Sequence, residues 1–460
     1  MILQEHSIIQ IGNHMIDISL LMAVLVGIII LLLLIIKLKI QPFIALLIAS
    51  IMVGVFAGLA PSEIIKTVQD GMGGTLGFVA VVVGLGAIFG AILEHSGGAE
   101  ALANYLLQLF GEKRASWALM LTGFFVAIPV FFDVAFIILI PLIYSIQRRT
   151  KKSLLLYAVP LLAGLAITHA FIPPTPGPVA VADIIKADLG WVILFGFIVG
   201  IPTAIVSGPI FAKYISNKIQ IDAPTLELSE VKNNGYPAVG LIISIIGIPI
   251  VLIVMSTLIT SGLLGDSFLN EYLTGWIQFF GHPFTALILA NCIAWYVLGI
   301  RRGATKDSLF KMATNSLGPA GIIILLTGAG GVFKQTLVDT GAGEMLANYF
   351  ANVGVSIFVV AFVCALLVRI LQGSATVAMI TAAGIVAPLL TDVSQMQRAL
   401  LVIAIAAGAS AMSHVNDSGF WLVSKYLGLS ETQTLKSWTV MTTLLALVGF
   451  VSVLILSLFV

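Results

Sequence analysis

The chain has 460 residues, of which 59% are hydrophobic and only 9% are charged, and its formal net charge is +1. Soluble proteins carry roughly 25% charged residues, so this composition predicts an integral membrane protein. The near-neutral charge excludes a strongly basic nucleic-acid-binding protein. The two cysteines, Cys292 and Cys364, lie far apart in apolar runs, which excludes a disulfide scaffold and a cysteine zinc site.

Apolar stretches long enough to cross about 30 Å of hydrocarbon occur along the whole chain. They lie near residues 17–38, 42–60, 75–95, 190–212, 237–260, 282–300, 317–337 and 437–460. The first has no preceding basic residue and no small-residue cleavage site, so we interpret it as a retained span. Apolar regions with interruptions form a second group, at residues 115–147, 153–186, 352–391 and 397–430.

An internal repeat divides the chain into two parts. GLGAIFGAILEHSGGAEALANYL (84–106) and GAGGVFKQTLVDTGAGEMLANYF (328–350) are identical at ten of 23 positions, with a constant spacing of 244 residues. His169 and His414 lie 245 residues apart, each directly after a small hydroxyl residue. The repeat predicts an all-α polytopic membrane protein with two copies of a unit of about six elements. The predicted domains are a first membrane repeat (1–215), a cytoplasmic linker (216–234) and a second membrane repeat (235–460).

The two copies are expected to be inverted relative to each other. If residues 115–147 and 352–391 form re-entrant hairpins, each copy crosses the membrane an odd number of times. Seventeen Lys and Arg residues then fall on one face and four on the other. By the positive-inside rule the first face is cytoplasmic. We therefore expect a multi-pass protein of the cell membrane with both termini outside.

The interruptions predict a binding site near the midplane of the membrane. Four prolines between residues 173 and 178 remove backbone donors and block the helix, so residues 172–178 are expected to be non-helical. Irregular backbone at membrane depth survives only where protein or a water-filled cavity surrounds it. In transporters with inverted repeats, such broken helices meet at the substrate site. Four segments are expected to converge: residues 129–133, 169–178, 369–376 and 414–419.

These segments contain the candidate substrate-binding residues, which offer hydroxyl, amide, imidazole and guanidinium groups and close backbone approach. They are His169, Thr175, Gly177, Arg369, Gly373, Ser374, Thr376, His414 and Asn416. Asp133 and Asp417 are the candidate proton carriers, because burial favours the neutral form of a carboxyl group.

Each charged candidate also has a structural interpretation. Asp133 could cap the returning half-helix of the hairpin. Asp417 could form an Asx-type turn, since the sequence N-D-S-G favours one. Arg369 could pair with a carboxylate and hold the second hairpin in place, and the two histidines could be ordinary structural residues.

Three motifs closely resemble the gluconate permease family of proton symporters, within the larger group of inverted-repeat, ion-coupled anion transporters. They are THAFIPPTPGP (168–178), GSATVAMITAAGIVAP (373–388) and SHVNDSGFWL (413–422). The resemblance extends over the full length and implies a secondary carrier of gluconate or a related sugar acid, as a dimer with scaffold and moving parts. It also implies that PPTPGP, GSAT and HVND line the substrate site. One branch of the family moves D-serine, and SHVND is more similar to the sugar-acid branch.

The sequence therefore predicts proton-coupled uptake of a sugar acid. The substrate carboxylate is expected near Ser374, Thr376 and Asn416, and its hydroxyl groups near Thr175 and the two histidines. A sodium-coupled carrier of a small hydroxy acid, a D-serine carrier and a passive pore remain as alternatives. A pump or an enzyme is disfavoured, because the sequence contains no P-loop, HExxH or GxSxG motif. No cofactor and no metal are expected.

Overall fold

The computed structural model describes residues 8–11, 14–128, 130–224, 236–260, 271–342, 345, 355–414 and 417–460. Within these residues the chain is almost entirely helical, which confirms the predicted all-α membrane class. A short antiparallel hairpin that the sequence does not predict, β1 (Ile8–Ile11) and β2 (His14–Asp17), precedes the first helix.

The described helices of the first half extend to Lys218. They are α1 (Ile18–Ile36), α2 (Pro42–Phe56), α3 (Pro61–His95), α4 (Gly98–Phe110), η1 (Glu112–Arg114), α5 (Ala115–Val126), α6 (Phe132–Thr150), α7 (Leu155–Phe171), α8 (Pro176–Ile184), α9 (Leu189–Ile205), η2 (Val206–Ile210) and α10 (Phe211–Lys218).

The described helices of the second half begin at Val239. They are α11 (Val239–Thr260), α12 (Glu271–Gly281), α13 (Pro283–Ala294), η3 (Trp295–Gly299), η4 (Ile300–Arg302), α14 (Lys306–Asp339), α16 (Ile357–Gln372), α17 (Ala375–Val386), η5 (Ala387–Leu389), α18 (Gln395–Ser410), α19 (Ser418–Leu427), α20 (Glu431–Thr434), η6 (Leu435–Thr439) and α21 (Val440–Leu456).

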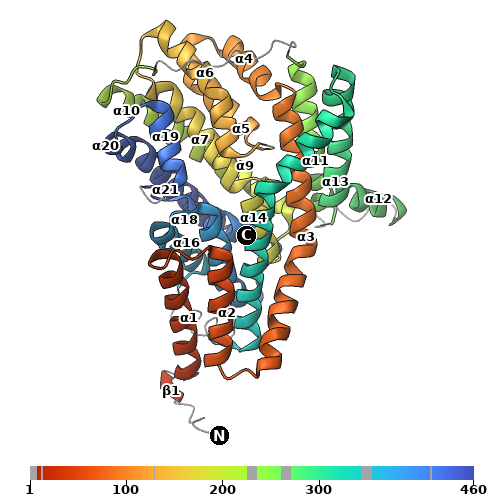
Figure 1. The fold of residues 1–460 in the computed structure, drawn as a ribbon, viewed down its shortest axis with the longest axis vertical. Helices are drawn as coiled ribbons and strands as arrows, with labels where there is room; N and C mark the ends of the chain where they lie inside the picture. Colours follow the sequence, from red (N-terminus) through yellow and green to blue (C-terminus); the bar gives the residue numbers. More distant parts are fainter. Residues whose placement is uncertain are drawn as a thin grey trace.

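Two long helices, α3 and α14, pack against each other through the centre of the molecule (Figure 1). Both are longer than the spans predicted near residues 75–95 and 317–337. α3 begins at Pro61, where a proline costs no hydrogen bond because first-turn N–H groups have no intrahelical partner. The two backbones approach closely at glycines: a Cβ added at Gly71 would lie 2.6 Å from Cα of Val332. Small residues at such crossings let membrane helices pack tightly.

The same order of elements follows each long helix. In the first half, α4 and η1 lead from α3 to a helix–turn–helix unit, α5–α6; the matching unit of the second half is α16–α17. A broken helix follows, α7–α8 and α18–α19, and then a long helix with a π-turn in it, formed by α9, η2 and α10 or by α20, η6 and α21.

One close helix contact also recurs in both halves. A Cβ added at Gly164 of α7 would lie 2.2 Å from the carbonyl oxygen of Met120 in α5. A Cβ added at Gly408 of α18 would lie 2.3 Å from the carbonyl oxygen of Phe362 in α16. Each broken helix therefore packs against the first helix of its hairpin without an intervening side chain. The inversion of the halves and their boundaries stay predictions.

The proline break is shorter than the sequence predicts. α7 ends at Phe171 and α8 begins at Pro176, so only residues 172–175 are non-helical. The prediction of a non-helical stretch through residue 178 was wrong, because Pro176 and Pro178 occupy the first turn of α8, where no intrahelical N–H bond is lost. The matching break lies between α18 and α19, and Asn416 within it lies outside the described residues.

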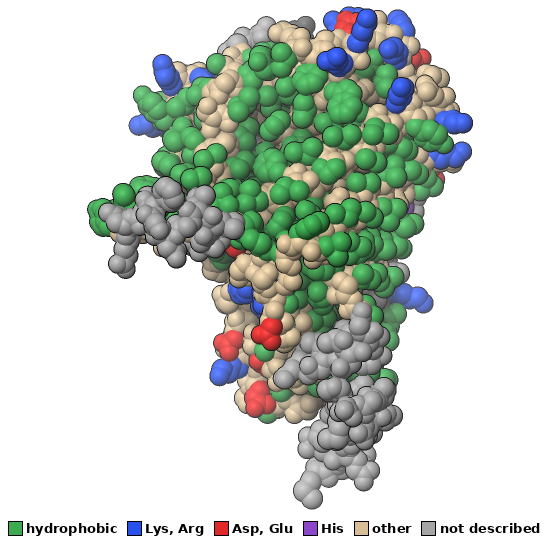
Figure 2. Space-filling view, turned by 180° about the vertical axis from the view of Figure 1, so that it is seen from behind, with side chains coloured by type: hydrophobic (Ala, Val, Ile, Leu, Met, Phe, Trp, Pro, Cys, Tyr) green, Lys and Arg blue, Asp and Glu red, His purple; other side chains and the backbone are tan. Residues whose placement is uncertain are grey.

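The outer surface fits a membrane-embedded protein. Within the described residues, seven helical segments are long and apolar enough to cross a bilayer: Pro61–His95, Leu155–Ile184, Leu189–Lys218, Val239–Ile259, Pro283–Arg302, Lys306–Asp339 and Glu431–Leu456. Figure 2 shows a broad apolar surface around the middle of the molecule, with Lys and Arg side chains gathered at its upper end. The fold and the surface together describe a multi-pass membrane protein.

Candidate functional site

A cavity of about 650 Å³ lies where the hairpin tips and the helix breaks meet. Its wall includes residues from all four segments that were predicted to converge, 129–133, 169–178, 369–376 and 414–419. Pro319 and Ile323 of α14 and Leu445 of α21 also contribute to the wall. The cavity therefore draws on both halves of the chain.

Four helices begin at this cavity. The wall contains first-turn residues of α6 (Phe132), α8 (Gly177), α17 (Thr376) and α19 (Ser418). First-turn N–H groups lack intrahelical partners and carry the positive end of the helix dipole. An anion in the cavity would thus be stabilised by several helix ends at once.

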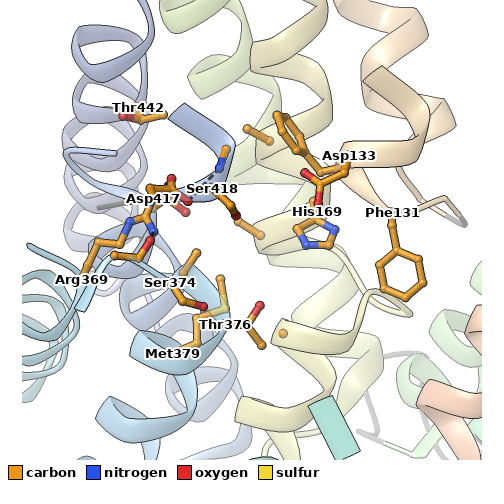
Figure 3. A pocket seen from close by; sticks show the side chains of 18 of the residues that line it. Phe131, Asp133, His169, Arg369, Ser374, Thr376, Met379, Asp417, Ser418 and Thr442 are labelled. Atoms are coloured by element: carbon orange, nitrogen blue, oxygen red, sulfur yellow. Dashed lines mark hydrogen bonds and ion pairs between the residues drawn. The ribbon is translucent and has the colours of Figure 1, made fainter. Parts of the chain in front are cut away.

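Arg369 and Asp417 form an ion pair on one side of the cavity (Figure 3). The Nη2 atom of Arg369 lies 2.5 Å from Oδ2 of Asp417, and the guanidinium also donates to the carbonyl oxygen of Gly373. The side chains of Arg369 and Asp417 are only 4% and 12% exposed. Arg369 Nε is buried without a hydrogen-bond partner among the described residues. The guanidinium therefore joins the tip of the second hairpin to the break between α18 and α19.

Asp417 is fixed from several directions. It is the N-cap of α19, where Oδ1 accepts a hydrogen bond of 3.0 Å from the backbone N–H of Gly419. The hydroxyl of Ser413 donates to Oδ2, and that hydroxyl accepts a hydrogen bond of 2.6 Å from the indole N–H of Trp438. The ion pair considered for Arg369 is thus present in the structure. The hydrogen bond from the N–H of Gly419, two residues on, to the Asp417 carboxylate is the Asx-type contact considered for Asp417.

Asp133 and His169 lie on the opposite side of the cavity from that ion pair (Figure 3). Asp133 stands in the first turn of α6, but the N-cap is Phe131 and no side chain caps this helix. The Asp133 carboxylate has no hydrogen bond or ion pair to another described residue. The Nδ1 atom of His169 is buried and also lacks a described partner, and its ring centroid lies 6.3 Å from that of Phe131. This side of the cavity thus offers unsatisfied polar groups.

The structure brings most of the candidate residues together. His169, Gly177, Arg369, Gly373, Ser374, Thr376, Asp133 and Asp417 all line the cavity. Thr175 is buried beside it in a small separate space, and its hydroxyl donates to the carbonyl oxygen of Ile172 at 2.6 Å. His414 is outside the cavity wall, and its Nδ1 lies 2.8 Å from the carbonyl oxygen of Met412.

The cavity wall also contains residues that were not among the candidate ligands or proton carriers. They are Phe131, Phe132, Gln372, Met379, Ser410, Trp438 and Thr442, besides small and aliphatic neighbours. Trp438 belongs to η6, a π-helical turn, and such turns frequently occur at functional sites. Sequence periodicity cannot reveal a π-turn inside an apolar span, so the residues of α21 had no visible signal.

Comparison with known proteins identifies the family of the chain. Residues 19–459 match the GntP family permease profile. The chain is 41% identical to the gluconate permease of Pseudomonas aeruginosa over 448 residues, covering 96% of this chain and 98% of that protein. It is also 41% identical to the low-affinity gluconate transporter of Escherichia coli (strain K12) over 439 residues, covering 95% of this chain and 97% of that protein.

A solved structure has the same fold. The YdaH transporter of Alcanivorax borkumensis superimposes with a TM-score of 0.63 at 14% sequence identity, covering 87% of this chain and 90% of that one. At this identity the likeness concerns the fold alone, whereas the family match extends over nearly the whole sequence. The chain therefore belongs to the GntP family of permeases.

Proposed function

We propose that the protein takes up gluconate or a related sugar acid across the cell membrane, driven by the proton gradient, without changing the substrate chemically. The relatives named for gluconate support the substrate class. The cavity volume of about 650 Å³ lies within the range of pockets that enclose small organic ligands. Polar groups at opposite ends of this cavity suit a molecule with a carboxylate at one end and hydroxyl groups along its length.

The substrate carboxylate binds, in this proposal, at the side where Arg369 lies. Arg369 presents a planar donor fork that matches a carboxylate. Ser374 and Thr376 stand at the start of α17, and Ser418 at the start of α19, so both helix dipoles favour an anion there. The hydroxyl groups of the substrate then extend towards His169 and Asp133. Asn416 is retained as a proposed ligand, although it lies outside the described residues.

The observation that carries proton coupling is the charge of the cavity wall. One arginine, Arg369, faces two carboxylates, Asp417 and Asp133. With both carboxylates ionised, the wall already holds one excess negative charge, and a bound sugar acid adds another. Like charges in one site disfavour each other, so a proton on one carboxylate makes substrate binding more favourable. By linkage, bound substrate equally favours uptake of the proton.

The two carboxylates have different parts in this scheme. Asp133 has no described partner and is the proposed proton carrier. Asp417 is already paired with Arg369, so an entering carboxylate competes with it for the guanidinium. When the substrate gains the guanidinium, Asp417 loses its counter-ion and becomes a second place where a proton can bind.

The remaining features of the proposal concern the whole assembly. We propose a homodimer in which the hairpin-bearing parts move against the other spans, exposing the cavity alternately to each side. We also propose that residues 216–234 form a cytoplasmic linker between the repeats 1–215 and 235–460, and that both termini are outside. The proposed partners are the sugar acid, the coupling proton and the lipid bilayer.

Uptake into proteoliposomes tests the function directly. Labelled gluconate is offered to vesicles with an inward proton gradient and no sodium, and accumulation above equilibrium that a protonophore collapses is expected. Accumulation that needs a sodium gradient instead would overturn proton coupling but retain a secondary carrier. Equilibration without accumulation under either gradient would point to a passive pore. Competition by D-serine but not by other sugar acids would overturn the substrate class.

A further inference from the structure

A second cavity of about 600 Å³ lies away from the proposed transport site, among the ends of several helices. Its wall is formed by η1, the start of α5, the segment between α6 and α7, the start of α7, and α10. Figure 1 shows the ends of α4, α6 and α10 at the top of the molecule, where Figure 2 shows Lys and Arg side chains gathered. None of its wall residues belongs to the transport cavity.

Four lysines from three separate segments surround this cavity. They are Lys113 in η1, Lys151 and Lys152 after α6, and Lys213 in α10. No salt bridge joins any of the four to a described carboxylate. The acidic residue in the wall, Glu112, is held by Arg149, whose Nε lies 2.8 Å from its Oε1. The cavity therefore has a strong excess of positive charge.

Apolar and aromatic side chains also form part of the mainly polar cavity wall. Leu156, Tyr157 and Pro209 contribute to it, and Trp117 stands in the wall with 39% of its surface exposed. The nearby hydroxyls of Ser116 and Ser153 already donate to backbone carbonyls, at 2.8 and 2.7 Å. Hydrogen bonds to a bound molecule would thus come from the lysine ammonium groups, which have three donors each, and from the side-chain amide of Asn217, which also lies in the wall.

We propose that this pocket binds a phosphate group, carried either by the head group of an anionic phospholipid or by a soluble phosphate ester. Basic pockets between membrane helices on the cytoplasmic side bind anionic head groups in this manner. Tryptophan prefers the level of the membrane interface, which suits Trp117 beside a lipid. The positive-inside rule explains basic residues on one face of a membrane protein, but it does not require four of them to line one cavity.

The test compares two double variants of the full-length purified protein. Lys152→Gln/Lys213→Gln removes two charges from the pocket, and Lys306→Gln/Lys311→Gln removes two exposed charges from the first turns of α14 as a matched control. Lipid retained by each protein is measured by native mass spectrometry after incubation with phosphatidylglycerol or with phosphatidylcholine. Thermal unfolding with glycerol phosphate or inorganic phosphate is measured in parallel.

We expect the affinity for phosphatidylglycerol to fall by roughly tenfold or more in the Lys152→Gln/Lys213→Gln variant. The same affinity should fall far less in the control variant. Stabilisation by glycerol phosphate that is lost in the same variant, with no preference for phosphatidylglycerol, would assign the pocket to a soluble ester. The proposal would be overturned if both variants lost affinity for phosphatidylglycerol equally. It would also be overturned if the protein retained the two lipids equally and neither phosphate compound changed its unfolding temperature. The outcome is independent of gluconate uptake, so it can fail while the proposed function stands.

Discussion

Arg369 joins two parts of the site, since its guanidinium contacts Asp417 and the carbonyl oxygen of Gly373, and it also lines the cavity. Replacing one member of a buried ion pair leaves the other without its partner, at a cost of about 3–5 kcal/mol. Arg369→Gln alone should therefore reduce both stability and transport. Arg369→Gln/Asp417→Asn removes both charges and should recover most of the stability, but not binding of the sugar acid.

This comparison separates a structural arginine from a substrate-binding one. Thermal unfolding of the detergent-purified variants measures the first, and the KM for gluconate uptake measures the second. An arginine with a purely structural role would give a double variant with normal KM. If Arg369 binds the substrate carboxylate, the KM should rise by roughly 10-fold or more even in the double variant, whose stability is largely restored.

Asp133 is the carboxylate without a described partner, and its replacement tests coupling. Asp133→Asn keeps the shape of the side chain but cannot release or accept the proton. Gradient-driven accumulation of gluconate should be lost, while exchange of labelled for unlabelled gluconate at equal pH should persist. Accumulation that survives intact in this variant would show that another group carries the proton. Asp183→Asn is a carboxylate control outside the cavity wall, and it removes a partner of Lys186 rather than a charge of the cavity.

The residues of the site were only partly predictable from the sequence. Proline, glycine and charge in otherwise apolar spans are strong signals, and they pointed to Asp133, Arg369 and Asp417. Which carboxylate pairs with Arg369 depends on how two distant helices pack, and no local pattern contains that information. Trp438 and Thr442 were missed because the sequence of η6 and α21 is typical of an ordinary apolar span.

At the scale of elements, the close contacts between broken helices and hairpins make a sharp prediction. Gly164→Ala and Gly408→Ala each place a methyl group little more than 2 Å from a backbone oxygen of the neighbouring helix. The helices must separate, which should lower the free energy of unfolding by about 1–3 kcal/mol. Gly247→Ala in α11 meets nothing within 4 Å and should be neutral or stabilising, because alanine favours the helix.

Thermal unfolding in detergent measures all three substitutions. If Gly164→Ala and Gly408→Ala unfold at the same temperature as Gly247→Ala, the helices do not need this close contact. Repeating the comparison in gluconate uptake shows whether the contact also positions the cavity, since α7 and α18 lead directly into the two breaks.

Element positions were predictable to the extent that they depend on composition. Apolar length located most spans, and prolines located the break between α7 and α8. Helix ends were predicted less accurately, because α3 and α14 begin well before their apolar stretches. Their first turns are polar, as at Glu63, whose carboxylate accepts from the N–H of Ala60, and polar turns are not typical of a membrane span. The short β1–β2 hairpin left no clear trace in the sequence.

At the scale of the whole molecule, orientation in the membrane can be measured. With Cys292 and Cys364 replaced by serine and alanine, a cysteine at Ser457 should react with an impermeant maleimide from outside intact cells. A cysteine at Lys306 should react only after the membrane is opened. The reverse pattern would invert the proposed topology.

The segment joining α1 to α2 lies near mid-height in Figure 1, away from the basic upper end of the molecule. The reactivity of a third cysteine, introduced at Lys39, would therefore locate this segment separately.

The charge arrangement of the cavity depends on both halves of the chain. Asp133 and His169 come from one half, whereas Arg369 and Asp417 come from the other. Sequence similarity between the halves predicted that matching segments would meet, but not that they would carry different charges. The repeat predicts equivalent backbone positions in the two halves. Which charged side chain stands at each position differs between the halves and cannot be inferred from the repeat.

The indole of Trp438 ends a chain of hydrogen bonds that begins at the guanidinium of Arg369 and passes through Asp417 and Ser413. Indole emission depends on the polarity and hydrogen bonding around the ring. The protein thus contains an intrinsic optical reporter on its own ion pair. Titration of gluconate against tryptophan fluorescence would follow occupation of the site in real time and without any label, when the signal of Trp438→Phe, which retains the other five tryptophans, is subtracted.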